Sequence, residues 1–129
     1  MSRKKTAITR LNQPHFRVPR RPPEIDASVD QFLSIVCDTS RRHILELLAE
    51  SNEKDPSAPN EQRSGEIAKA LGLSNAATSE HLHHLADLHL VLTRKQGTAV
   101  YYRLSNHLLI QAFFDFLLVL DRHYQKKPS

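Results

Sequence analysis

The chain has 129 residues, of which 40 % are hydrophobic and 25 % are charged, with a net charge of +4. This length suits one domain of ordinary globular composition. The single cysteine excludes an intrachain disulfide, and three glycines argue against a β-sandwich or barrel. The longest apolar run, over 108–120, is too short to span a membrane and contains Gln111 and Asp115.

The positive charge is concentrated at the N-terminus. Residues 1–23 hold seven basic residues, four prolines and no acidic residue, whereas residues 24–129 hold 11 basic and 14 acidic residues, a net charge of −3. This pattern predicts a disordered tail, which serves either as a solubilising segment or as an arm that contacts DNA phosphates. No apolar segment follows the first charges, so we expect no signal peptide and a cytoplasmic protein.

Two helices are predicted before the middle of the chain. Apolar residues at helical spacing over 25–37 indicate a short amphipathic helix. Asp38 or Thr39 can cap a second helix, and the polar residues 51–62, with two prolines, indicate a loop. Because Cys37 follows an apolar stripe, we interpret it as a small buried hydrophobic residue.

The next segment has the pattern of a helix-turn-helix. Ser64 is the expected cap of a two-turn helix, and Gly72 is placed to end it in a left-handed conformation. Ser74 can then cap a second helix that runs to about Leu88. Two helices joined by a short turn with glycine are typical of helix-turn-helix proteins.

A β-hairpin is expected directly after this second helix. Residues 91–95 and 99–104 are rich in β-forming residues and flank the turn 96–98. A final helix is predicted from Asn106, as its cap, to Tyr124. The order ααααββα predicts a mainly α winged helix-turn-helix fold, with a domain over 24–124 and a short tail over 125–129.

The last predicted helix is apolar on most of its surface. His107, Gln111, Asp115 and Arg122 form one narrow polar strip on a helical wheel. A single small domain cannot cover the remaining sides, so we expect a homodimer built from the first and last helices. The predicted interface consists of Phe32, Leu109, Phe113, Phe116, Leu117 and Leu120.

In their order and motifs, these elements resemble the ArsR/SmtB family of winged-helix transcriptional repressors. The resemblance is carried by segments 38–45, 64–73 and 74–91 and by the hairpin, with Thr39 standing where the family usually has proline. It implies a homodimer that binds a palindromic operator in double-stranded DNA. The family's metal-sensing patterns, by contrast, do not match: the aligned positions on the last helix carry Asn106, Leu108, Val119 and Arg122. Redox sensors of the family need two cysteines, and this chain has only Cys37.

The segment 79–89 contains four histidines, and a helical wheel separates them. His81 and His89 fall toward the core, so we interpret His81 as a packed, hydrogen-bonded residue, and His89, near the helix end, as either interior or partly exposed. His83 falls on the outer face. The outer face of such a helix enters the major groove. The predicted DNA contacts on this helix are Ser74, Asn75, Ala77, Ser79, Glu80 and His83. The predicted contacts on the hairpin are Arg94, Lys95, Gln96 and Arg103.

Two other functions stay open at this stage. Glu80, His83, His84 and Asp87 have a spacing that can bring ligands to one ion, which would make the protein a metal-responsive regulator. Alternatively, the net charge of −3 and the acidic residues of this helix fit a protein-interaction module. No catalytic constellation or phosphate-binding loop is present in the sequence, so we expect neither an enzyme nor a cofactor, and the sequence does not favour a metal inducer.

Overall fold

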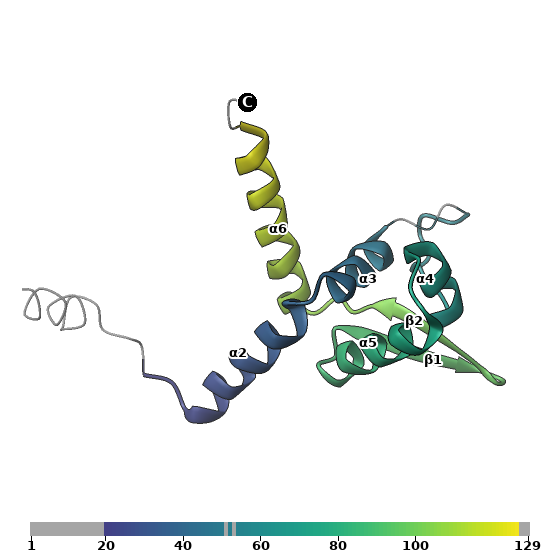
Figure 1. Ribbon diagram of the computed structural model, residues 1–129, viewed down its shortest axis with the longest axis horizontal. Helices are drawn as coiled ribbons and strands as arrows, with labels where there is room; N and C mark the ends of the chain where they lie inside the picture. Colours follow the sequence, from purple (N-terminus) through teal and green to yellow (C-terminus); the bar gives the residue numbers. More distant parts are fainter. Residues whose placement is uncertain (1–19, 51, 53, 127–129) are drawn as a thin grey trace, which may run out of the picture. The chain divides into compact units, whose positions relative to one another are not determined.

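A computed structural model describes residues 20–50, 52 and 54–126, and Figure 1 shows their elements in chain order. Most of the predicted N-terminal tail and the end of the C-terminal tail lie outside the described residues. The chain divides into two units at Gln31 and Phe32. The described residues form five helices and one two-stranded antiparallel sheet, which confirms the predicted order of elements.

The first helix, α2 (Pro23–Val36), crosses the boundary between the two units. Proline suits the first helical position, because the N–H that it lacks would have no partner there. Glu24 and Asp26 add negative charge in the first turn, and Arg21 forms an ion pair of 3.0 Å with Asp26. Within the second unit, Ile35 and Val36 are buried.

Helix α3 (Thr39–Ala49) is capped by Asp38, one of the two predicted candidates, and Thr39 is its first helical residue. The Asp38 carboxylate accepts a hydrogen bond of 3.0 Å from the backbone N–H of Arg41. This hydrogen bond is the main cause that holds the pKa of Asp38 below its usual value of 3.8, because it stabilises the ionised carboxylate. Arg42 donates to the carbonyl of Val36 at 2.6 Å and so ties α3 to the preceding helix.

Helices α4 (Ser64–Leu71) and α5 (Asn75–Asp87) form the predicted helix-turn-helix. Gly72 ends α4 in the left-handed region with φ 68°, as expected, and Ser74 caps α5. The cap of α4 differs from the prediction. Ser64 is the first helical residue, Arg63 is the cap, and the Glu66 side chain accepts the backbone N–H of Arg63 at 2.8 Å.

The hairpin consists of β1 (Val91–Gln96) and β2 (Ala99–Leu104) around a turn at Gly97 and Thr98, where Gly97 has φ 62°. Val91 pairs with Leu104 and Gln96 with Ala99, so the strands are in register over their full length. Figure 1 shows the hairpin beside α4 and α5. This arrangement is the predicted wing.

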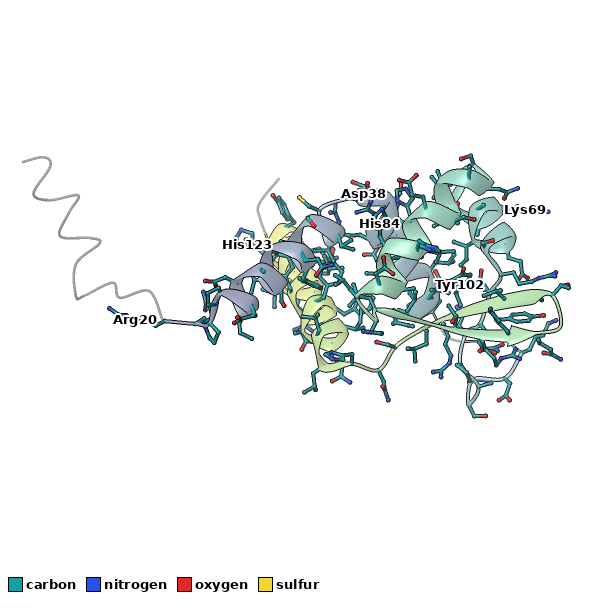
Figure 2. The ribbon with its side chains drawn as sticks, turned by 90° about the horizontal axis from the view of Figure 1, so that it is seen from below. Arg20, Asp38, Lys69, His84, Tyr102 and His123 are labelled. Carbon is teal, nitrogen blue, oxygen red and sulfur yellow. The ribbon has the colours of Figure 1, made fainter. Side chains whose placement is uncertain are left out.

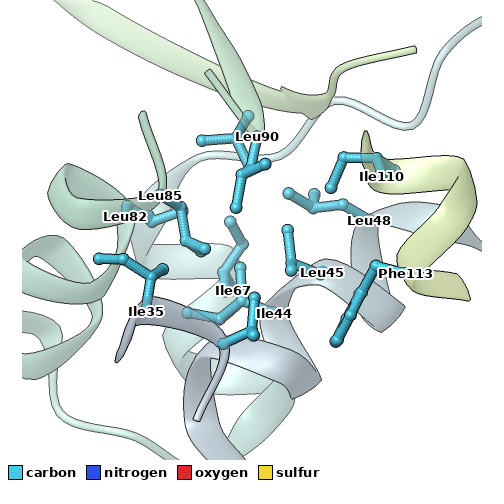
Figure 3. Close-up of a cluster of buried hydrophobic side chains, with 12 residues drawn as sticks. Ile35, Ile44, Leu45, Leu48, Ile67, Leu82, Leu85, Leu90, Ile110 and Phe113 are labelled. Atoms are coloured by element: carbon cyan, nitrogen blue, oxygen red, sulfur yellow. The ribbon is translucent and has the colours of Figure 1, made fainter. Parts of the chain in front are cut away.

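The hydrophobic core of the second unit lies between the helices and the base of the hairpin (Figure 3). Every helix of this unit contributes to it: Ile35, Val36, Ile44, Leu45, Leu48, Ile67, Leu82, Leu85, Leu90, Val91, Ile110 and Phe113. Six of these side chains are fully inaccessible, among them Leu82 and Leu85 of α5. The core therefore fixes which face of α5 remains outside.

The last helix, α6 (Leu108–Lys126), begins one residue later than the predicted cap Asn106 implies. His107 takes the capping role, because its Nδ1 accepts the backbone N–H of Leu109 at 3.1 Å. Ile110 and Phe113 are buried, whereas Leu109, Phe116 and Leu120 are exposed. No described helix has the length and apolar character needed to cross a membrane.

The interpretation of Cys37 was wrong, because its side chain is exposed. Helix α2 ends at Val36, and the chain then turns into α3. The apolar periodicity of the helix therefore stops applying one residue before the cysteine, and its side chain leaves the buried stripe.

Candidate nucleic-acid interface

Helix α5 presents a polar face to the outside of the molecule. Ser74, Asn75, Ser79, Glu80 and His83 are all exposed, and Ala77 is half-buried. The opposite face is anchored by Leu82 and Leu85 in the core. All six predicted contacts of this helix therefore lie on its accessible side or at the edge of that side.

The start of α5 is held by two hydrogen bonds. The Ser74 hydroxyl accepts the backbone N–H of Ala77 at 3.1 Å, and the buried Thr78 hydroxyl donates to the Ser74 carbonyl at 2.8 Å. These bonds fix the first turn, where the exposed backbone N–H groups and side chains of a recognition helix meet DNA. Asn75 thus lies in a turn held by two hydrogen bonds, and Ser79 follows directly after that turn.

His81 ties α5 to α3, as its predicted packed position suggested. The Nε of Arg41 donates to the His81 Nδ1 at 3.2 Å, and His81 is half-buried. The backbone N–H of the same arginine donates to the Asp38 carboxylate, and its guanidinium donates to the Ile35 carbonyl at 3.5 Å. Arg41 therefore links the recognition helix to the junction of α2 and α3, which includes Asp38 (Figure 2).

The predicted inward position of His89 was wrong. Helix α5 ends at Asp87, and His89 adopts a left-handed conformation with φ 58° and an exposed side chain. The wheel applies only while the helix continues, so its angle for His89 has no meaning. Histidine is one of the few residues besides glycine that occur in this conformation with some frequency.

The outward histidines do not gather into a metal centre. His84 Nε2 lies 4.0 Å from the Glu80 carboxylate, on a partly exposed helix face. In the described part of the chain, no three histidine, cysteine or carboxylate side chains are placed to hold a metal ion. The structure thus gives no support to the alternative in which Glu80, His83, His84 and Asp87 share an ion.

The two faces of the hairpin carry different side chains. Residues paired across antiparallel strands lie on the same face, so Thr93, Lys95, Val100 and Tyr102 share one face. This inner face lines a groove with Leu82, His83 and Asp87 of α5. Figure 2 shows Tyr102 on the hairpin close to the helices. Lys95 is therefore the basic hairpin residue on the side of the recognition helix.

The other predicted hairpin contacts lie on the outer face. Arg94 and Arg103 both point to Glu61, a residue that the sequence reasoning did not consider. The hydrogen bond that Arg94 donates to Glu61 raises the pKa of Arg94, because the carboxylate stabilises the positive charge. Gln96 accepts a hydrogen bond of 2.9 Å from Arg94 on the same face. The structure thus separates Lys95 from Arg94, Gln96 and Arg103.

A second groove separates α4 from the tip of the hairpin. Arg63, Ser64, Gly65 and Lys69 line it on the helix side, and Thr98, Ala99 and Val100 line it on the hairpin side. Sequence reasoning also missed Arg63 and Lys69. Their signal was available, since they are the two basic residues at the ends of the first helix of the helix-turn-helix.

Comparisons with known proteins agree with this geometry. A family profile described as "Bacterial regulatory protein, arsR family" matches residues 38–92. Reduced HlyU from Vibrio cholerae is 31 % identical, with a TM-score of 0.59, over 75 % of this chain and 92 % of HlyU. The chain belongs to the ArsR family of bacterial regulatory proteins. Curated protein sequences gave no match.

Two further structures extend the comparison of this ArsR-family chain. NolR from Sinorhizobium fredii is 28 % identical with a TM-score of 0.62, over 80 % of this chain and 96 % of NolR. The winged helix-turn-helix DNA-binding domain of Mb0332 from Mycobacterium bovis, a possible ArsR-family regulator, is described as homodimeric. It is 25 % identical with a TM-score of 0.66, over 87 % of this chain and 98 % of that domain. The winged-helix fold of an ArsR-family transcriptional regulator is thus established for this chain.

Proposed function

We propose that this ArsR-family chain is a homodimeric repressor that binds a palindromic operator in double-stranded DNA. The observation that carries the proposal is the exposed N-terminal part of α5, where Ser74 caps the backbone and Asn75 and Ser79 are exposed. Asparagine can form two hydrogen bonds with adenine in the major groove, and serine can contact bases or phosphate. As a regulator of this kind, it would work in the cytoplasm.

Basic residues at both flanks of α5 support phosphate contacts. The helix contains no lysine or arginine, and Glu80 and Asp87 are acidic. Positive charge comes instead from Arg63 and Lys69 beside one groove and from Lys95 beside the other. Phosphate contacts position a protein on the duplex, whereas base contacts select the sequence. The proposed interface therefore joins α5 to Lys69 and Lys95, with Arg63 at the edge.

The exposed apolar face of α6 supports the homodimer. Leu109, Phe116 and Leu120 are exposed and share one side of the helix with the buried Phe113. The ring centroids of Phe113 and Phe32 lie 6.1 Å apart. Together with Leu33 and Val36 they line apolar grooves. A two-fold contact between identical faces would cover this surface. The similar Mb0332 domain is homodimeric. Phe113 itself belongs to the core, and Leu117 and Phe32 are half-buried beneath the face.

A selection from fragmented genomic DNA tests the proposal. We expect the purified full chain to enrich a palindromic site, and its affinity for that site to fall steeply as salt rises. Asn75→Ala should cost about 1–3 kcal/mol of binding at one base position and relax the preference there, as measured by fluorescence anisotropy. Asn106→Ala, the same change at an exposed position outside the interface, should leave affinity unchanged.

Enrichment of no sequence, with equal affinity for all duplexes, would contradict the proposed function. The proposal also assigns no metal to operator release. Binding that changes on addition of Zn²⁺ and recovers with a chelator would overturn that part alone.

A further inference from the structure

The segment just before α4 extends the sheet of the wing. The backbone of Gln62 exchanges two hydrogen bonds with Tyr102 of β2, of 3.0 and 2.8 Å. The Gln62 side chain donates to Asn60, and Asn60 donates to the Leu47 carbonyl of α3 at 3.0 Å. Residue 62 is therefore held between β2 and α3, and its neighbour Glu61 has a fixed position beside the hairpin.

The register of this pairing places Glu61 on the outer face. Gln62 and Tyr102 lie opposite each other, so the side chains on either side of them in sequence point to the other face. Glu61 therefore shares a face with Arg103, and Arg94 of β1 lies on that face as well. A short local pairing thus brings one carboxylate to both arginines of the wing.

Every side-chain nitrogen of Arg94 has a partner in this arrangement. Its Nε and Nη2 both lie 3.0 Å from Oε1 of Glu61, and its Nη1 donates to Gln96 at 2.9 Å. The guanidinium also lies over the Tyr101 ring, 4.7 Å from its centroid. Nε of Arg103 is 3.9 Å from Oε2 of Glu61. The Glu61 side chain is only 19 % exposed, so solvent weakens these contacts less than it weakens an open surface pair.

We propose that Glu61 determines the DNA specificity of this protein by holding Arg94 and Arg103 on the outer face of the wing, away from nucleic-acid phosphates. The inference rests on the proposed function, because Glu61 would influence DNA binding through the two arginines. Phosphate contacts add affinity for every sequence, because the backbone carries the same charge everywhere. By pairing with two arginines, Glu61 limits this sequence-independent attraction. Base contacts from α5 then decide which DNA sequence is bound.

The variant Glu61→Gln tests the proposal because it keeps the size of the side chain and removes its charge. We expect affinity for a random-sequence duplex to rise about fivefold to tenfold at low salt, with a salt slope steeper by about 1–2, one increment for each released arginine. Operator affinity should rise less, so the ratio of specific to random binding falls. Both affinities are measured by fluorescence anisotropy on the full chain across a salt series.

Two further proteins separate this effect from a simple change of net charge. Glu46→Gln removes a charge from an exposed carboxylate on α3 and should raise random-sequence affinity less than twofold. The triple variant E61Q/R94A/R103A should return random-sequence affinity to the wild-type level. An equal rise in Glu46→Gln and Glu61→Gln, or a rise that persists in the triple variant, would overturn the proposal.

The double variant R94A/R103A gives a test that does not depend on the folding of Glu61→Gln. If Glu61 already occupies both arginines, their removal should change random-sequence affinity by less than twofold. A loss greater than fivefold would show that the arginines contact DNA in the wild type and would overturn the inference. A wild-type chain that binds no duplex at all would contradict the proposed function instead, so the two failures are distinguishable.

Discussion

Single residues set the ends of helices in the helix-turn-helix through their backbone conformations. Gly72 has φ 68° at the end of α4, where an L side chain is strained even though there is open space around it. Gly65, in the first turn of α4, also has open space but helical backbone geometry. The same substitution at these two glycines therefore separates conformational strain from steric fit.

Gly72→Ala should lower the free energy of unfolding by about 1–2 kcal/mol, because alanine must adopt the left-handed conformation. Gly65→Ala should raise it by about 0.5–1 kcal/mol, because alanine has the higher helix propensity and meets no atom within 4 Å. Urea unfolding followed by circular dichroism measures both. Shifts of the same sign would show that the backbone of one glycine differs from that described above.

Asp38 also acts at the scale of one residue, through its carboxylate at the start of α3. Its pKa is lowered chiefly by the hydrogen bond from the Arg41 backbone N–H. A depressed pKa means that the native state favours the ionised carboxylate. The stabilisation is therefore present above pH 3.8 and is lost as the pH falls through the lower, native-state pKa.

Asp38→Ala should lower the free energy of unfolding by about 1 kcal/mol at pH 7, the usual effect of losing such a cap. The difference from wild type should shrink as the pH falls from 3.8 through the lower, native-state pKa, because the ionised carboxylate is progressively protonated over that range. Asp38→Asn should lose much less at pH 7, because asparagine caps about as well. Thermal unfolding at pH 7 and pH 3 provides the comparison, and a difference independent of pH would exclude the charge as its cause.

At the scale of elements, neighbouring segments decide what each helix and strand can present. Helix α5 owes its orientation to Leu82 and Leu85 in the core and to the hydrogen bond between Arg41 and His81. The hairpin owes its polarity to the register of β1 and β2, which places Lys95 and Arg94 on opposite faces. The segment before α4 pairs with β2 through Gln62, and this pairing places Glu61 on the outer face of the hairpin beside Arg94.

Much of the element scale follows from local sequence, but the partners of the wing do not. The end of α4 was predicted from Gly72, the start of α5 from Ser74, and the strands of the hairpin from their composition. The contact between Glu61 and Arg94 joins residues 33 positions apart. Because no pattern at helical or strand spacing connects them, sequence reasoning grouped Arg94, Lys95, Gln96 and Arg103 as one set of DNA contacts.

At the scale of the whole molecule, α6 has more apolar surface than the second unit can bury. The helix places Ile110 and Phe113 in the core and leaves Phe116 and Leu120, farther along the side that carries Phe113, exposed. Leu118 is also exposed but lies about 160° around the helix from Leu120, near the polar strip. The proposed dimer therefore predicts different effects of the same substitution at these two leucines.

Leu120→Glu should convert the homodimer into monomers, because it places a charge inside a two-fold apolar contact. We expect the dissociation constant to rise at least a hundredfold in sedimentation velocity, and operator affinity to fall with it. Leu118→Glu should leave the assembly unchanged. Dissociation by both variants, or by neither, would contradict the proposed interface.

The sequence by itself determined the order of elements, the capping residue Ser74, the left-handed Gly72 and the outward position of His83, and it narrowed the cap of α3 to Asp38 or Thr39. These features depend on signals within one or two turns, such as helical periodicity and side-chain hydrogen bonds to nearby backbone groups. Only the tertiary structure decided which hairpin residues face α5, where Cys37 and His89 point, and that Glu61 forms ion pairs with two arginines. Those outcomes depend on where elements end and on contacts between distant segments, and local patterns contain neither.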